Sequence, residues 1–140
     1  MLRILVIDAQ GGGIGKQIIS GLRARKLPVS ITAVGTNTLA TTAMLRAGAD
    51  AAATGENAVI VACRTAQIIV GPFGIATADA MMGEISPAMA NAVASSTAYR
   101  VLIPMNLCNT YVAGVIKGSS AILEDAVAHI RALVEKENHA

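Results

Sequence analysis

The chain has 140 residues and a formal net charge of +2, and 54% of its residues are hydrophobic while only 14% are charged. A chain of this length can bury a full core, so we predict one domain over residues 1–140. In a typical soluble domain about a quarter of the residues are charged, so this chain has too few charges to cover a monomer in the usual way. The composition therefore predicts either a membrane protein or a subunit that hides apolar surface in an oligomer.

The membrane alternative is excluded by interruptions in the most apolar stretch. Arg64, Pro72 and Asp79 divide residues 57–83, which leaves no uninterrupted span of about 20 apolar residues. The sequence also opens directly on a strand-like segment, without the basic and apolar regions of a signal peptide. We therefore predict a cytoplasmic protein that self-associates, most simply as a homodimer.

Nucleic-acid and metal binding are not expected from the composition. With one Phe, two Tyr and no Trp, the chain has almost no aromatic side chains on which bases could stack. Its eleven basic residues are spread along the sequence rather than gathered in a stripe. Cys63 and Cys108 are too few for a disulfide framework, and no cysteine or histidine cluster indicates a metal site.

Apolar runs and capping signals predict strands that alternate with helices. Runs of strand length occupy residues 3–8, 29–35, 67–72, 99–104 and 111–116. Helical spacing or helix starts lie between and after them, over 14–26 and 39–48, from about Gly55, from Ser86-Pro87, and from Ser119 or Ser120. Residues 49–65 give the least clear pattern, because their β-branched residues also fit a strand.

This alternation predicts an α/β fold, a Rossmann-like or flavodoxin-like three-layer sandwich with a mostly parallel sheet of about five strands. Only six residues separate Pro104 from the run at 111–116. A parallel crossover needs roughly a dozen residues, so this last strand is expected to be antiparallel if it pairs with 99–104.

Four glycines lie close together in residues 6–18, VIDAQGGGIGKQI, directly after the first predicted strand. Glycine is entropically costly to order, so this density indicates a tight turn or the close approach of another group. A helix that begins after such glycines presents free N–H groups and a partial positive charge, which favour phosphate or carboxylate. Lys16 in its first turn is unfavourable unless a bound anion, or a salt bridge to Asp8, offsets the helix dipole.

The predicted binding site lies at the carboxyl ends of the strands, where open parallel sheets hold their ligands. Small residues and amides follow these strands, which suits hydrogen bonds to a polar ligand. We predict a site for a small anionic ligand formed by Asp8, Gln10, Gly11, Gly12, Gly13, Ile14, Gly15, Lys16, Thr36, Asn37, Gly71, Pro72, Asn106 and Asn109.

The glycine segment matches no standard nucleotide motif fully. A Walker A loop is excluded by Gln10 and Gln17, and a G-x-G-x-x-G motif counted from Gly11 would place its third glycine at Lys16. No acidic residue ends the strand at 29–35 to bind an NAD ribose, and no Arg follows there to bind the 2′-phosphate of NADP. NAD, NADP or another nucleotide remain the candidate cofactors.

Two other interpretations of this segment stay open. The glycines could be purely structural and allow close packing of strand and helix. Asp8-x-Gln10-x-x-Gly13 also resembles the D-x-H-x-x-G loop of flavodoxin-like cobalamin-binding domains, although Gln10 stands where that family has its cobalt-ligating histidine.

The sequence offers no convincing catalytic set. Cys108 has no evident base, because the two histidines, His129 and His139, lie in or beyond the last helix. Glu56 or Glu84 could act as a general base, but a solvated or helix-capping carboxylate is the commoner case. Three functions therefore stay open: a sensor or accessory protein that binds a phosphorylated metabolite, an NAD(P)-linked enzyme whose cofactor carries the hydride chemistry, and a structural or interaction subunit.

Six segments together resemble one small bacterial family that is known only as a domain of unknown function. They are VIDAQGGGIGKQI, GTNTLATTAMLRAGA, ATGENAV, GPFGIA, GEISP and PMNLCN, and they extend over nearly the full 140 residues. The resemblance implies a compact cytoplasmic α/β protein and no particular activity.

Overall fold

The computed structural model describes residues 1–105, 107, 109–115 and 118–138. Its sheet contains the strands β1 (Leu2–Asp8), β2 (Val29–Gly35), β3 (Ala51–Thr54), β4 (Ile68–Pro72) and β5 (Tyr99–Ile103). Its helices are α1 (Gly13–Ala24), α2 (Thr38–Arg46), α3 (Glu56–Cys63), the 3-10 helix η1 (Phe73–Ala76), α4 (Pro87–Ser95) and α5 (Ser119–Asn138). The predicted alternation of strands and helices is confirmed.

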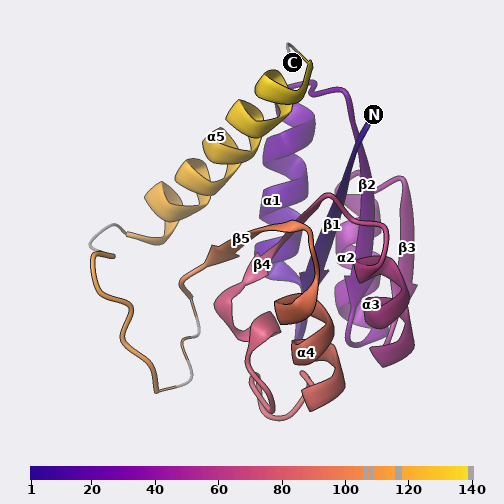
Figure 1. Cartoon of the computed structure of the whole chain (residues 1–140), viewed down its shortest axis with the longest axis vertical. Helices are drawn as coiled ribbons and strands as arrows, with labels where there is room; N and C mark the ends of the chain where they lie inside the picture. Colours follow the sequence, from indigo (N-terminus) through magenta and orange to yellow (C-terminus); the bar gives the residue numbers. More distant parts are fainter. Residues whose placement is uncertain (106, 108, 116–117, 139–140) are drawn as a thin grey trace.

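The strands lie in the order β3-β2-β1-β4-β5, and every neighbouring pair is parallel. This is the order of the first five strands of a Rossmann fold, whereas flavodoxin has the order 2-1-3-4-5. The chain starts in the middle of the sheet, moves outward to β3 and then returns to the other side of β1 (Figure 1). The carboxyl ends of β1 and β4 therefore form the switch point at which such sheets bind ligands.

Helices cover both faces of the sheet and complete the three layers. Leu22 of α1, Met44 of α2 and Ile130 of α5 belong to one buried cluster, while Val59 of α3 and Val93 of α4 belong to a second cluster on the opposite face. Strand β1 contributes side chains to both clusters. Burial on both faces explains why its sequence is almost continuously apolar.

Helix starts follow the capping signals in the sequence. The hydroxyl of Ser86 accepts a hydrogen bond from the Met89 amide at 3.2 Å, and Pro87 is the first residue of α4. Helix α3 begins directly after Gly55, as expected. Helix α5 begins at Ser119. In the described part of the chain, no helix is both long and apolar enough to span a membrane.

The expected strand at 111–116 is wrong for residues 111–115, and Ile116 lies outside the described residues. Gly114 has a φ of 88°, which is incompatible with an extended strand, so the expected antiparallel pairing with β5 is not formed there. The fifth strand is instead β3, which pairs with the end of β2 at the edge of the sheet. Its sequence, AAAT, contains no large apolar side chain and therefore carries no strand signal.

Candidate functional site

The turn after β1 and the turn after β2 are joined by hydrogen bonds at the carboxyl edge of the sheet. The Thr36 amide donates to the Asp8 carbonyl at 3.1 Å, and Asn37 Nδ2 donates to the Gln10 carbonyl at 2.9 Å. Asn37 also caps α2, because its Oδ1 accepts from the Ala40 amide at 2.9 Å. The structure thus brings together the residues that were predicted at the ends of these two strands.

The other predicted residues do not join this group in the same way. Gly71 and Pro72 are buried residues of β4 itself, and a Cβ at Gly71 would lie 2.3 Å from the Ile7 carbonyl oxygen. Gly71 is therefore required for the close approach of β4 to β1. Asn109 is exposed in the segment that follows β5, and Asn106 and Cys108 lie outside the described residues.

The glycine loop has the geometry of a G-x-G-x-x-G turn when it is counted from position 10. Gln10 has a φ of 52° and Gly12 a φ of 73°, so the first two positions adopt the left-handed conformation that favours glycine. A Cβ at Gly15 would lie 3.1 Å from Asp8 Cβ, which is the close helix–strand packing assigned to the third glycine of the motif. Counting from Gly11 missed this spacing because Gln10 occupies the first position.

The other two glycines of this loop, Gly11 and Gly13, are not required by packing. A Cβ at Gly11 or Gly13 would meet no atom within 4 Å, and neither residue has a left-handed φ. Both residues are exposed, and their amides have no hydrogen-bond partner among the described residues. These two N–H groups are therefore available to a ligand that approaches the turn.

The buried carboxylate of Asp8 holds the amides at the start of α1. Its Oδ1 accepts from the Ala9 amide at 2.8 Å and its Oδ2 accepts from the Gly15 amide at 2.7 Å. Burial raises the pKa of Asp8, against the opposing effect of these N–H groups and that of Ile14. Part of the anion-binding capacity of this helix end is thus used within the protein, and Ile14 and Gly15 do not offer their amides to a ligand.

Lys16 is exposed in the first turn of α1 and has no ion pair with any described residue, so the alternative of a salt bridge to Asp8 is not realised. It lines a shallow cleft between α1 and α5, together with Glu124. No ion pair among the described residues therefore offsets the unfavourable position of this cation near the helix N-terminus, although the Asp8 carboxylate lies at the same helix end.

Glu84, in the segment between η1 and α4, connects the two turns. Its Oε1 accepts hydrogen bonds from the Gln10 amide at 3.0 Å, from Thr36 Oγ1 at 2.6 Å and from Asn37 Nδ2 at 2.9 Å. The Thr36 hydroxyl, and then the Gln10 amide and Asn37, lower the pKa of Glu84. Glu84 is thus an ionised acceptor held by three donors rather than a freely solvated base.

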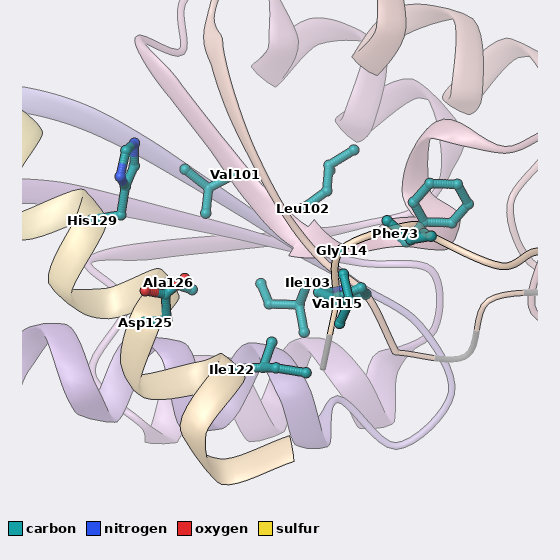
Figure 2. Close-up of a pocket in the computed structure, with 12 residues that line it drawn as sticks. Phe73, Val101, Leu102, Ile103, Gly114, Val115, Ile122, Asp125, Ala126 and His129 are labelled. Carbon is teal, nitrogen blue, oxygen red and sulfur yellow. The ribbon is translucent and has the colours of Figure 1, made fainter. Parts of the chain in front are cut away.

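A cavity of about 480 Å³ lies between the edge strand β5 and helix α5. It is formed by β5, by α5 and by residues near Gly114, and Phe73, the first residue of η1 after β4, reaches one side of it (Figure 2). His129 borders this cavity, and its Nε2 lies 2.9 Å from the Tyr99 hydroxyl. Neither Glu84 nor any residue of the glycine loop lines it.

The described residues contain no recognisable catalytic or metal-binding set. Cys63 is buried on the α3 face, and burial raises its pKa to about 11, which makes it an inert thiol at neutral pH. Among the described residues, no group of three or more His, Cys, Asp or Glu side chains is placed to hold a metal ion.

The strand order defines a Rossmann-like α/β domain, and the turn after β1 has left-handed φ values at the first two glycine positions of a G-x-G-x-x-G spacing. Residues 3–136 match the family model of a domain of unknown function, DUF3842, and the chain belongs to this family. No curated protein and no solved structure matches the chain.

Proposed function

We propose that this domain binds a nucleotide or another phosphorylated metabolite at the turn between β1 and α1, and acts as a sensor or accessory protein. The observation that carries the proposal is the coincidence of dinucleotide-turn geometry at Gln10, Gly12 and Gly15 with the switch point of the sheet. The phosphate would accept from the Gly11 and Gly13 amides and be approached by Lys16. A non-glycine residue held at φ 52° in this turn is the kind of strained position that clusters at ligand sites.

An NAD(P)-linked enzyme is the second candidate, favoured by the same geometry and by the cavity beside β4 and β5. A dinucleotide that crosses the switch point extends from the end of β2 toward the end of β4, and the cavity reaches Phe73 on that side. The nicotinamide supplies the hydride chemistry in such enzymes, so the thin set of acid–base residues does not exclude this activity.

A structural role without a ligand is the third candidate, and two glycines favour it. A Cβ at Gly12 would lie 2.8 Å from Ala40 Cα, and a Cβ at Gly15 would lie 2.5 Å from Met44 Sδ. Packing against α2 thus accounts for these two glycines by itself. It does not account for Gly11 and Gly13, which face open space.

The opening experiment combines mass spectrometry of small molecules released from the denatured protein with thermal shifts against NAD, NADP, ATP, FMN and cobalamin. A released nucleotide, or stabilisation by one nucleotide of the panel, supports the binding function. Stabilisation by cobalamin alone would favour the cobalamin alternative, although the strand order is not that of a flavodoxin-like domain. A protein that none of the five compounds stabilises would favour the structural role.

Lys16→Ala is expected to weaken binding of the nucleotide that stabilises the wild type by about three- to tenfold, because one cation near the phosphate is lost. The melting temperature of the unliganded variant is expected to stay the same or rise slightly, since Lys16 has no ion pair in the described structure and a cation in the first turn opposes the helix dipole. Isothermal titration calorimetry of the two proteins measures the difference.

Lys26→Ala is the matched control, because it removes the same charge from a position two residues beyond the end of α1. If both lysine variants lose affinity equally, the effect is one of net charge. If Lys16→Ala binds as tightly as the wild type, the phosphate does not lie on this turn.

We further propose a cytoplasmic homodimer, supported by the low content of charged residues and by large apolar side chains that are exposed in the described monomer. They include Leu39 and Leu45 of α2, Val61 of α3, Met82, Tyr99 and Tyr111. Light scattering is expected to give about twice the chain mass of 14.2 kDa. A stable species at the chain mass, without aggregation, would contradict the dimer.

A further inference from the structure

Glu84 places a carboxylate at the carboxyl end of β2, where neither the strand nor the two residues after it supply one. Strand β2 ends at Gly35 and is followed by Thr36 and Asn37, neither of which is acidic. The Thr36 hydroxyl and the Asn37 amide both donate to Glu84 Oε1, so the acid reaches this position from the segment between η1 and α4. In Rossmann domains, an acidic residue near this position accepts a hydrogen bond from the 2′-hydroxyl of the adenosine ribose.

Among the described residues, hydrogen bonds reach only one oxygen of the Glu84 carboxylate. All three hydrogen bonds go to Oε1, and Oε2 accepts none from the described residues. The side chain is half-buried, and Oε2 is the carboxylate oxygen left without a donor among the described residues. Three donors hold the carboxylate in one orientation, so its second oxygen is already fixed before a ligand arrives. Binding then costs little side-chain entropy.

On the basis of the proposed nucleotide-binding function, we propose that Glu84 Oε2 accepts a hydrogen bond from a ribose hydroxyl and thereby selects a free 2′-hydroxyl over a 2′-phosphate. A ribose hydroxyl supplies the donor that this oxygen lacks. A 2′-phosphate would bring further negative charge next to an ionised carboxylate. No arginine in the described part of the chain hydrogen-bonds to Gln10, Thr36, Asn37 or Glu84 and could offset it.

This role of Glu84 decides between NAD and NADP, a choice that the residues after β2 leave open. Thr36 and Asn37 leave room for a 2′-phosphate, and by themselves they favour neither NAD nor NADP. With Glu84 hydrogen-bonded to both residues, that space holds a negative charge, and the expected ligand is NAD or another nucleotide with an unmodified ribose.

The test is the ratio of the Kd values for NADP and NAD, measured by calorimetry on the wild type and on Glu84→Gln. The glutamine carbonyl oxygen can still accept from the three donors, while its NH₂ group replaces the free oxygen and the charge is removed. We expect NAD binding to weaken about tenfold or more, because a hydrogen bond to a charged acceptor is lost. NADP binding is expected to tighten, so that the preference for NAD falls or reverses.

Glu56→Gln is the matched control. Glu56 accepts a hydrogen bond at 2.5 Å from the hydroxyl of Ser86, which lies two residues after Glu84. Replacing Glu56 by Gln changes the net charge by the same amount as Glu84→Gln and removes no hydrogen bond at the end of β2. This variant is expected to keep the wild-type ratio. Thermal denaturation of both variants shows that they are folded.

The unfavourable outcomes are distinct. If the wild type binds no nucleotide of the thermal-shift panel, the proposed function fails, and this inference fails with it. If it binds ATP or FMN but neither dinucleotide, the proposed function stands and the selection of NAD over NADP is wrong. If both dinucleotides bind but Glu84→Gln keeps the wild-type ratio, only the role of Glu84 is wrong. If Glu84→Gln tightens NAD and NADP equally, Glu84 is an internal competitor for an anion rather than a ribose acceptor.

Discussion

Gly12→Ala is expected to lower the free energy of unfolding by about 3 kcal/mol or more, because left-handed backbone strain costs about 1–2 kcal/mol and overpacking costs about 1–3 kcal/mol. Gly12 has a φ of 73°, and a Cβ there would lie 2.8 Å from the Cα and 2.9 Å from the carbonyl oxygen of Ala40. Both of these atoms belong to the backbone of α2 and cannot move aside as a flexible side chain could. Urea denaturation followed by circular dichroism measures the loss.

Gly13→Ala is the control for this prediction. It is the first residue of α1, its φ is not left-handed, and a Cβ there would meet nothing within 4 Å. Alanine is preferred to glycine in helices by up to about 1 kcal/mol, so this variant is expected to be as stable as the wild type or slightly more so. Equal stability of the Gly12 and Gly13 variants would mean that the turn does not pack on α2 as described.

The parts of the fold that the sequence predicts well are those in which a local signal and burial agree. Strand β2 was expected at 29–35 and is observed there, because its branched apolar residues are buried within the sheet. The start of α4 was expected at Ser86-Pro87 because the cap depends on those two residues alone. Strand β3 could not be predicted, since main-chain pairing with β2 holds four residues with small side chains.

The candidate site shows the same division between local and distant contacts. The turn residues Gln10, Thr36 and Asn37 were expected together because parallel strands end at one edge of the sheet. The link from Thr36 to Glu84 spans 48 residues, and no sequence pattern marks it. It depends on how the segment before α4 crosses the sheet. Residues such as Asp79 and Met82 have positive φ values there, although their sequence gives no sign of this.

Asp8→Ala is expected to have the second largest effect on stability. It should lower the free energy of unfolding by about 2 kcal/mol at acidic pH, because a buried N–H group left without an acceptor costs about 1–3 kcal/mol. Removing the carboxylate takes the acceptor away from the Ala9 and Gly15 amides at the start of α1. No other described side chain hydrogen-bonds to these amides. Urea denaturation of wild type and variant at several pH values measures the difference.

The size of this difference is expected to depend on pH in a direction set by the burial of Asp8. Burial raises the pKa of Asp8 above its ordinary value of 3.8, so the folded protein keeps the proton where the unfolded chain has lost it. The stability that Asp8 contributes is then fully present below 3.8 and is lost as the pH rises through the raised pKa. The gap between wild type and Asp8→Ala should therefore shrink from acidic toward neutral pH.

Asp50→Ala supplies the opposite slope as a control. The Ile31 amide, followed by Arg23, lowers the pKa of Asp50, so its contribution is present above 3.8 and is lost as the pH falls. If the gap for Asp8→Ala widened with rising pH as it should for Asp50→Ala, the N–H groups would outweigh burial at Asp8. If the stability difference between wild type and Asp8→Ala shrinks as expected, rising pH places a negative charge on Asp8, at the start of α1 next to the turn that carries Gly11 and Gly13. Nucleotide binding should then weaken over the same pH range in which Asp8 ceases to stabilise the fold.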